Sequence, residues 1–200
     1  MSLSERLAYP LSNTDLNFLL PGVPITTYAR FAEEPQINSV VDGSGRGLVL
    51  FVSSVQGRSM SGHWLAILVR PDEGNVLLFD PYGGKRDPWG LNHGFVHSKR
   101  TLSELGEAMP LLVPYFQRHG LKAVFNVTRD QRMALNIGTC GRHCVVRLWK
   151  ATMPDDEYDT WVHGFEESPD VVVTRLTDEH LLKRGQAGPV YETDSDDFQE

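Results

Sequence analysis

The sequence lacks long apolar runs, a secretory signal and an excess of basic residues. No part of its 200 residues approaches the ~18 apolar residues that a transmembrane helix needs, so we expect no membrane span. Residues 1–6 do not have the basic and then apolar pattern of a signal peptide. The formal net charge is −7, whereas a nucleic-acid-binding surface needs a basic excess. We therefore expect no broad nucleic-acid footprint. The basic pairs at 85–86 and 99–100 are interpreted as solvated loop charge, which leaves a local phosphate contact open.

Cysteine is also scarce. The chain has only Cys140 and Cys144, and their spacing of four places both on one side of a helix. They provide no disulfide framework, which favours a reducing, intracellular setting. With His143 they offer three metal ligands, but structural zinc needs a fourth, and no second cysteine pair exists. We predict no metal site and interpret Cys144 as a core residue.

The composition fits one folded domain with a tail. Hydrophobic residues make up 40% of the chain, which is enough for a core. We predict a single domain over residues 1–185. Residues 186–200 contain Gly and Pro and then a run of acidic residues, a composition typical of a disordered, solvating tail. A tail that inhibits the domain, or is trimmed by it, stays open.

The spacing of apolar residues predicts short strands and helices after an irregular start. Residues 1–12 are expected to be a loose lead-in, followed by a short helix that starts near Ser12 and ends before Pro21. Strands are expected over 25–28, 47–53, 63–70, 75–80 and 122–128. Helices are expected over 101–119, 141–152, 155–165 and 168–184, the first interrupted by two prolines. Residues 81–99 are expected to form a long loop, a kind that is often functional.

The two strands around the turn at 71–74 must be antiparallel neighbours, because the turn is so short. Pairing Arg70 with Glu73 places His63 directly opposite Asp80, and a register shift of two residues still leaves them diagonal neighbours. Opposite residues have Cβ atoms about 5 Å apart. The sequence therefore predicts that an imidazole and a carboxylate meet at one end of this hairpin.

Cys140 directly precedes an apolar helical pattern and is expected in the first turn of a buried helix. Unpaired N–H groups and the positive end of the helix dipole favour a thiolate there. Gly138 and Gly141 would let a substrate backbone approach the sulfur. A buried cysteine alone is more often a core residue than a nucleophile. His63 and Asp80 favour the nucleophile, because a reactive thiol needs a base and a group that orients the base.

Three motifs occur in order along the chain. They are Gly-His-Trp at 62–64, Phe-Asp-Pro-Tyr-Gly at 79–83 and Thr-Cys-Gly-Arg-His-Cys at 139–144. Together they resemble the adenain/Ulp1 cysteine peptidases, a group that includes the adenovirus maturation protease, proteases of other DNA viruses and virophages, and SUMO-deconjugating enzymes. The viral, adenain-like branch is the more similar, and the resemblance covers 47–150 well and the flanks weakly. It implies an α+β, papain-like or adenain-like fold, with a central, mostly antiparallel sheet and the nucleophile helix packed against it.

By this resemblance Cys140 is the nucleophile, His63 the base and Asp80 the orienting acid. The family also has a glutamine shortly before the cysteine that donates to the oxyanion. Here Gln131 lies nine residues upstream, farther than is usual, and Asn136, four upstream, is the alternative donor. We favour Gln131, with the backbone N–H of Cys140 as the other donor.

Substrate-binding residues are also implied. Trp64 is interpreted as strand core, as large aromatics usually are. The resemblance also implies that it forms the wall of a narrow slot that admits glycine-like residues, and the two roles are compatible. Gly62 is expected to line the same cleft. For Ser61, Gly83 and Gly84 we favour turn formation over a place in the cleft.

The function implied is that of a cysteine endopeptidase that processes viral capsid or core precursor proteins after small, glycine-containing motifs. Its location would be the virion and the host cell interior, or an intracellular one if the source is not viral. No cofactor is expected, although the resemblance leaves an activating peptide or DNA open. The alternatives are an isopeptidase that removes SUMO or another ubiquitin-like protein, and a catalytically silent binding domain.

Overall fold

A computed structural model describes residues 1–27, 33, 36–54, 60–83, 112–132, 134 and 136–183 of the chain, without the side chains of 51–54 and 60–62. The first part of the helix expected over 101–119, Gly84, the two basic pairs and the acidic tail lie outside the described residues. Among the described helices, none is long and apolar enough to cross a bilayer.

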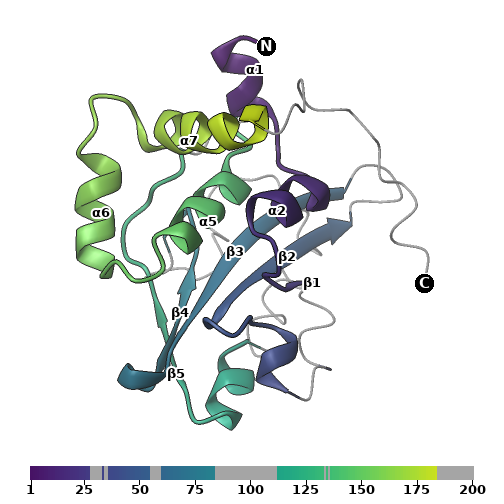
Figure 1. The fold of residues 1–200 in the computed structure, drawn as a ribbon, viewed down its shortest axis with the longest axis vertical. Helices are drawn as coiled ribbons and strands as arrows, with labels where there is room; N and C mark the ends of the chain where they lie inside the picture. The colour runs from purple at the N-terminus through teal and green to yellow at the C-terminus, as the bar shows by residue number, and fades with distance from the viewer. Residues whose placement is uncertain are drawn as a thin grey trace.

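Five described strands form one mixed sheet in the order β1-β2-β3-β4-β5 (Figure 1). Their bounds are β1 Ile25–Thr27, β2 Arg46–Ser54, β3 Met60–Arg70, β4 Asn75–Phe79 and β5 Lys122–Phe125. The central pairings β2/β3 and β3/β4 are antiparallel, but β1/β2 and β4/β5 are parallel. The predicted antiparallel arrangement thus holds for the three central strands, and the two edge strands make the sheet mixed. A long connection precedes both β2 and β5, and it returns the chain to the same end of the sheet, which makes the new pairing parallel.

The described helices with defined bounds are α1 Leu3–Ala8, α2 Asn13–Leu19, α5 Cys140–Trp149, α6 Asp155–His163 and α7 Pro169–Lys183. Residues 112–118 are helical as well. Ser12 caps α2 as its sequence predicts, since its side chain accepts from the backbone N–H of Asp15 and the Asp15 side chain accepts in return. The loose lead-in predicted for residues 1–12 is wrong, because Ser2 and Glu5 make a second capping box that starts α1.

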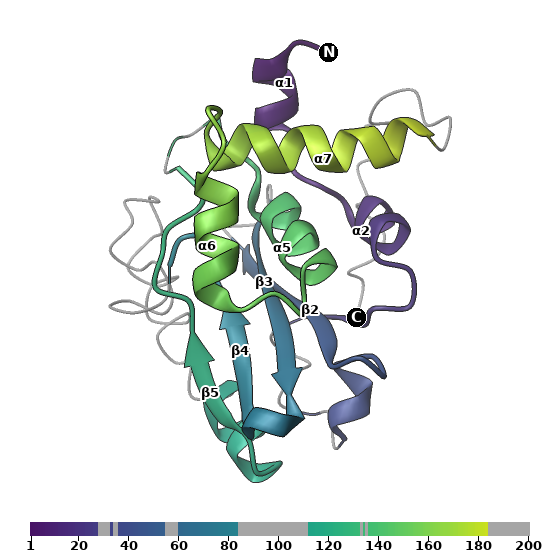
Figure 2. The ribbon, with the colours of Figure 1, turned by 60° about the vertical axis from the view of Figure 1, so that its left-hand side comes forward.

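Helices cover both faces of the sheet. Figures 1 and 2 show α5 lying across one face, with α2 beside it and α7 crossing above it. Alternate residues of β3 divide between two apolar clusters, as the period of a strand requires. Trp64, Ala66 and Leu68 pack with α5, whereas Leu65 and Ile67 pack with the helical residues around Tyr115 on the other face. The nucleophile helix predicted from the sequence is thus buried against the sheet.

The register of the β3/β4 hairpin differs from the simplest prediction by two residues. Arg70 pairs with Asn75 and Ala66 with Phe79, because a 3₁₀ turn at Pro71–Glu73 and a left-handed Gly74 occupy the connection. This register leaves His63 and Asp80 as diagonal neighbours, which is the alternative that the sequence already allowed.

Candidate active site

The His63 imidazole and the Asp80 carboxylate are hydrogen-bonded at the end of the hairpin. Nε2 of His63 lies 2.9 Å from Oδ1 of Asp80. Asp80 follows β4 directly and is 1% exposed, whereas the His63 side chain is 24% exposed. The predicted meeting of the two side chains is therefore confirmed. Because Nε2 is hydrogen-bonded to the carboxylate, Nδ1 is the ring nitrogen that can exchange a proton with a second group.

Asn126 fixes the backbone of Asp80 and was not singled out from the sequence. The amide N–H of Asp80 donates to Asn126 Oδ1 at 2.8 Å, and Asn126 Nδ2 donates to the carbonyl oxygen of Asp80 at 2.7 Å. Both residues are buried and lie just beyond the ends of two paired parallel strands, β4 and β5. The amide side chain therefore continues the sheet hydrogen bonds where β5 has ended. The sequence predicted a strand over 122–128 with Asn126 inside it, and only the observed end of β5 at Phe125 places Asn126 beside Asp80.

Tyr82 is a second residue whose individual role the sequence did not suggest. Its ring stacks on His63 with the centroids 4.9 Å apart and the planes 23° from parallel. Its backbone N–H donates to Asp80 Oδ1 at 2.9 Å, on the oxygen that also accepts from His63. Burial raises the pKa of the Tyr82 phenol, and the negative charges of Cys140 and Asp80 raise it further. Tyr82 is therefore a neutral aromatic cover on the imidazole.

Cys140 is one of the groups that raise the pKa of His63. Burial lowers the pKa of the imidazole, but the charge of Asp80, its hydrogen bond and the hydrogen bond with Cys140 raise the pKa to about 10. The imidazolium is consequently the favoured form at neutral pH. A cation beside a sulfur favours the thiolate, which is the nucleophilic form of cysteine.

The local sequence places Cys140 at the start of α5, as predicted. Thr139 is the N-cap residue, but its side chain makes no capping hydrogen bond, so the first N–H groups of the helix are not capped by it. A side chain at Gly141 would lie 3.2 Å from Cδ1 of Trp64, so glycine lets the helix approach the indole closely. Cys144 is fully buried, donates to the carbonyl of Trp64 and has a pKa raised by burial. Its interpretation as a core residue is confirmed.

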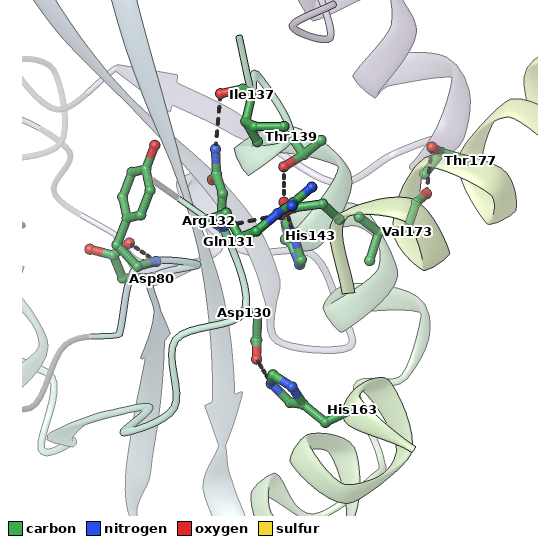
Figure 3. Close-up of polar contacts among 12 residues, drawn as sticks. Asp80, Asp130, Gln131, Arg132, Ile137, Thr139, His143, His163, Val173 and Thr177 are labelled. Carbon is green, nitrogen blue, oxygen red and sulfur yellow. Dashed lines mark hydrogen bonds and ion pairs between the residues drawn. The ribbon is translucent and has the colours of Figure 1, made fainter. Parts of the chain in front are cut away.

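The two amides considered as oxyanion donors have very different surroundings. Gln131 is 1% exposed, and its Nε2 donates to the carbonyl of Ile137 at 3.4 Å (Figure 3). A primary amide has two N–H donors, so one remains after this contact. Its backbone N–H is held by the carbonyl of Pro81, next to Asp80. Asn136 is exposed. A preorganised donor must be fixed away from bulk water, which favours Gln131.

The residues proposed to bind substrate are only partly described. Trp64 is 5% exposed and belongs to the apolar cluster that contains Cys140. The backbone of Gly62 pairs with Val52 in β2, and the side chain of Ser61 lies outside the described ones. Gly83 has φ +80° and packs against the carbonyls of residues 127 and 128, which supports its turn role.

Two further histidines have carboxylate partners that the sequence pattern did not indicate. His143 donates from Nε2 to Asp170 at 3.1 Å, and both residues are fully buried. His163 lies 2.9 Å from Asp130 (Figure 3). Across the part of the chain that the structure describes, no group of three or more His, Cys, Asp or Glu side chains is arranged to hold a metal ion.

No family model matches the chain. It is 27% identical over 178 residues to a protein of the Sputnik virophage called uncharacterized protein V9, a match that covers 86% of this chain and 95% of that protein. Among solved structures, the central domain of the uncharacterized Lpg1148 protein from Legionella pneumophila matches with a TM-score of 0.39 and 13% identity, over 87% of this chain and 98% of that chain. ChlaDub1 from Chlamydia trachomatis matches with a TM-score of 0.40 and 10% identity, over 93% and 91%. With TM-scores of 0.39 and 0.40, function is inferred from the side-chain geometry of the site.

Proposed function

We propose that the protein is a cysteine endopeptidase in which Cys140, His63 and Asp80 form the catalytic triad. The observation that carries this proposal is the chain of contacts from sulfur to imidazole to a buried carboxylate. Cys140 lies close enough to His63 to raise the pKa of the imidazole, and Nε2 of His63 lies 2.9 Å from Oδ1 of Asp80. A cysteine that only fills space in a core needs neither a neighbouring base nor a group that orients such a base. A nucleophilic cysteine needs both.

The reaction follows from the protonation states. The Cys140 proton passes to Nδ1 of His63, and the thiolate attacks the carbonyl carbon of the scissile peptide. The imidazolium then gives its proton to the leaving amine, which departs and leaves a thioester on Cys140. His63 next takes a proton from water, and the hydroxide attacks the thioester. The tetrahedral intermediate expels the Cys140 thiolate, the His63 imidazolium returns its proton to the sulfur, and the product carboxylic acid is released.

The oxyanion of each tetrahedral intermediate needs donors fixed before the reaction. We assign this role to the backbone N–H of Cys140, at the start of α5, and to the side-chain amide of Gln131. Asn136 is rejected as the donor because it is exposed. Trp64, buried beside Gly141, is assigned to the wall of the slot for the residue before the scissile bond, with Gly62 as a second lining residue.

The proposed substrates are capsid or core precursor proteins, cleaved after small, glycine-containing motifs. The motif resemblance to adenain-like proteases supports this, and so does the similarity to a virophage protein. The setting would then be the host cell and the virion. An isopeptidase acting on a ubiquitin-like protein would use the same triad, so the choice between them is made by substrate.

The first test compares the reactivity of the two cysteines. The chain is treated with limiting iodoacetamide near neutral pH, and labelling is measured by mass spectrometry in wild type and His63→Ala. We expect Cys140 to alkylate much faster than Cys144, whose pKa is raised by burial, and the preference to vanish in the variant. Equal, slow labelling of both cysteines in the wild-type chain would contradict the proposal.

The second test identifies the substrate class. Peptides with internal Gly-X bonds are compared with SUMO and ubiquitin adducts, with Cys140→Ala as the inactive control. Cleavage of the peptides supports precursor processing, and cleavage only of the adducts assigns the chain as a deconjugating isopeptidase. Preferential labelling of Cys140 without cleavage of either would contradict both assignments.

A further inference from the structure

One buried carboxylate, that of Asp170, contacts the chain on both sides of the loop that precedes the nucleophile. Its Oδ2 accepts from the backbone N–H of Arg132 at 3.1 Å and from Arg132 Nε at 3.2 Å. Its Oδ1 accepts from Thr139 Oγ1 at 2.5 Å and from His143 Nε2 at 3.1 Å. Asp170 is in the first turn of α7 and has no exposed surface. Figure 3 shows Arg132, Thr139 and His143 gathered at the first turn of α5.

The two contact points of Asp170 are the immediate neighbours of the two proposed oxyanion donors. Arg132 directly follows Gln131, and Thr139 directly precedes Cys140. Nine positions separate the donors along the chain. A loop of this length does not by itself fix the distance between its ends, because closing it costs conformational entropy. A single carboxylate that binds both ends fixes that distance.

The burial and charge of Asp170 support a role beyond docking α7 onto α5. Removing a carboxylate from water is costly, so a fully buried one is retained where its donors are well placed. Burial raises the pKa of Asp170, but the hydrogen bond and charge of His143, together with Thr139 and Arg132, lower it below its ordinary value. Helix α7 is already tied to α5 by a second pair, Arg142 with Asp178 at 2.7 Å. Docking of α7 therefore does not depend on Asp170 alone.

We propose that Asp170 is a positioning residue for the oxyanion hole, and that it holds Gln131 and the Cys140 N–H at a working separation despite the long loop between them. This inference rests on the proposed peptidase function. Asp170 does not touch the reacting atoms. It acts through Arg132 on one donor and through Thr139 on the other, so its loss should slow the chemical step and leave substrate affinity and the His63–Cys140 pair intact.

The test measures kcat, KM and Cys140 alkylation in Asp170→Asn. The amide keeps the size but loses the charge, and its NH₂ group cannot accept from the donors on that side. We expect kcat to fall at least about tenfold, and by no more than the roughly 10²–10³-fold that loss of an oxyanion donor costs. KM and the preferential labelling of Cys140 should be unchanged. The matched control is Asp155→Asn, in the first turn of α6, whose carboxylate binds Arg70 and Arg147 away from the site and should leave kcat unchanged.

A double-mutant cycle separates positioning from general destabilisation. In a Gln131→Ala background, Asp170→Asn should lower kcat by a smaller factor than in wild type, because one of the two donors whose separation it fixes is gone. Arg132→Ala keeps the carboxylate in place, and because its side chain is largely exposed, this variant should fold and show a smaller fall in kcat. An undiminished effect of Asp170→Asn in the Gln131→Ala background, or an unchanged kcat in Asp170→Asn, would overturn the inference.

The two proposals fail in different ways. If the wild-type chain does not label preferentially at Cys140 and cleaves none of the substrates, the peptidase function fails, and the oxyanion inference fails with it. If the wild-type chain is active but Asp170→Asn loses both kcat and the labelling preference, the peptidase function stands. Asp170 would then act on the nucleophile or on the fold, and its positioning role would be rejected.

Discussion

The imidazole of His63 has a neighbour of different chemistry on each of three sides. The Asp80 carboxylate accepts a hydrogen bond from Nε2, and the Tyr82 ring covers one face of the imidazole. Cys140 is the third neighbour, and it helps to raise the pKa of the ring. The acid raises the pKa of the ring, and the aromatic cover limits access of water to the acid–base contact. The imidazolium form of His63 is therefore favoured at neutral pH before substrate arrives.

At the residue scale, Asp80→Asn should move the alkaline limit of activity to lower pH. The imidazolium must be present to protonate the leaving amine, and the Asp80 charge raises the pKa of His63 to about 10. The isosteric amide keeps a hydrogen-bond group but removes that charge, so the proton on His63 is lost at lower pH. The check is the pH profile of kcat/KM in both forms. Superimposable alkaline limbs would show that Asp80 does not set the protonation of His63.

Two of the proposed triad residues, and the asparagine that holds one of them, lie at the ends of regular elements. Asp80 follows β4, Asn126 follows β5, and Cys140 begins α5. Because β4 and β5 are parallel, their carboxyl ends meet at one edge of the sheet, and this brings Asn126 to the backbone of Asp80. The ends of rigid elements hold side chains accurately while leaving them accessible.

At the element scale, Asn126→Ala should reduce both stability and activity. The change leaves the amide N–H and carbonyl of Asp80 without their buried partners, and each unsatisfied group costs about 1–3 kcal/mol. We also expect kcat to fall, because Asp80 loses the contacts that fix its backbone. Urea unfolding and kcat measurement on the same sample check this.

A matched control for that variant is Asn75→Ala. Asn75 is at the opposite end of β4, where its amide donates to an exposed Glu73. This variant should lower stability less and leave kcat near that of wild type. Equal loss of kcat in both variants would mean that the effect is one of general destabilisation.

The molecule as a whole is held by two apolar layers on either side of the sheet. The layer that contains Cys140 and Trp64 packs under α5 and α7, and the other packs under the helical residues 112–118. The site lies where the first layer meets the ends of β3 and β4, so folding of the whole domain assembles the triad.

At this scale, the His63–Asp80 pair should contribute a pH-dependent part of the free energy of unfolding. The folded-state pKa of His63 is raised from 6.5 to about 10, so the stabilisation is fully present below pH 6.5 and is lost as the pH rises through about 10. The measurement is urea unfolding of wild type and His63→Ala from pH 6 to 10. Wild type should lose stability relative to the variant over this range, and parallel curves would contradict the raised pKa.

The sequence by itself determined the local parts of this protein. The hairpin follows from two apolar runs and a short turn, and it brought His63 to Asp80 even though its register is shifted by two residues. The start of α5 at Cys140 and the starts of α2 and α7 follow from caps and apolar spacing. These features depend on residues close in the chain, so a local pattern contains the needed information.

Only the tertiary structure decided the long-range parts. The parallel pairings of β1 with β2 and of β4 with β5 depend on how long connections return, which no local pattern specifies. Three sets of contacts join residues from different parts of the chain. They are Asn126 with Asp80, Tyr82 with His63, and Asp170 with both ends of the loop between the two proposed oxyanion donors. Gln131 is buried and Asn136 is exposed, a difference that no local pattern specifies and that supports the proposal of Gln131 as the donor. The sequence thus determined which groups are proposed to do the chemistry, and packing decided which groups hold them in place, because positioning contacts form only between segments that the fold brings together.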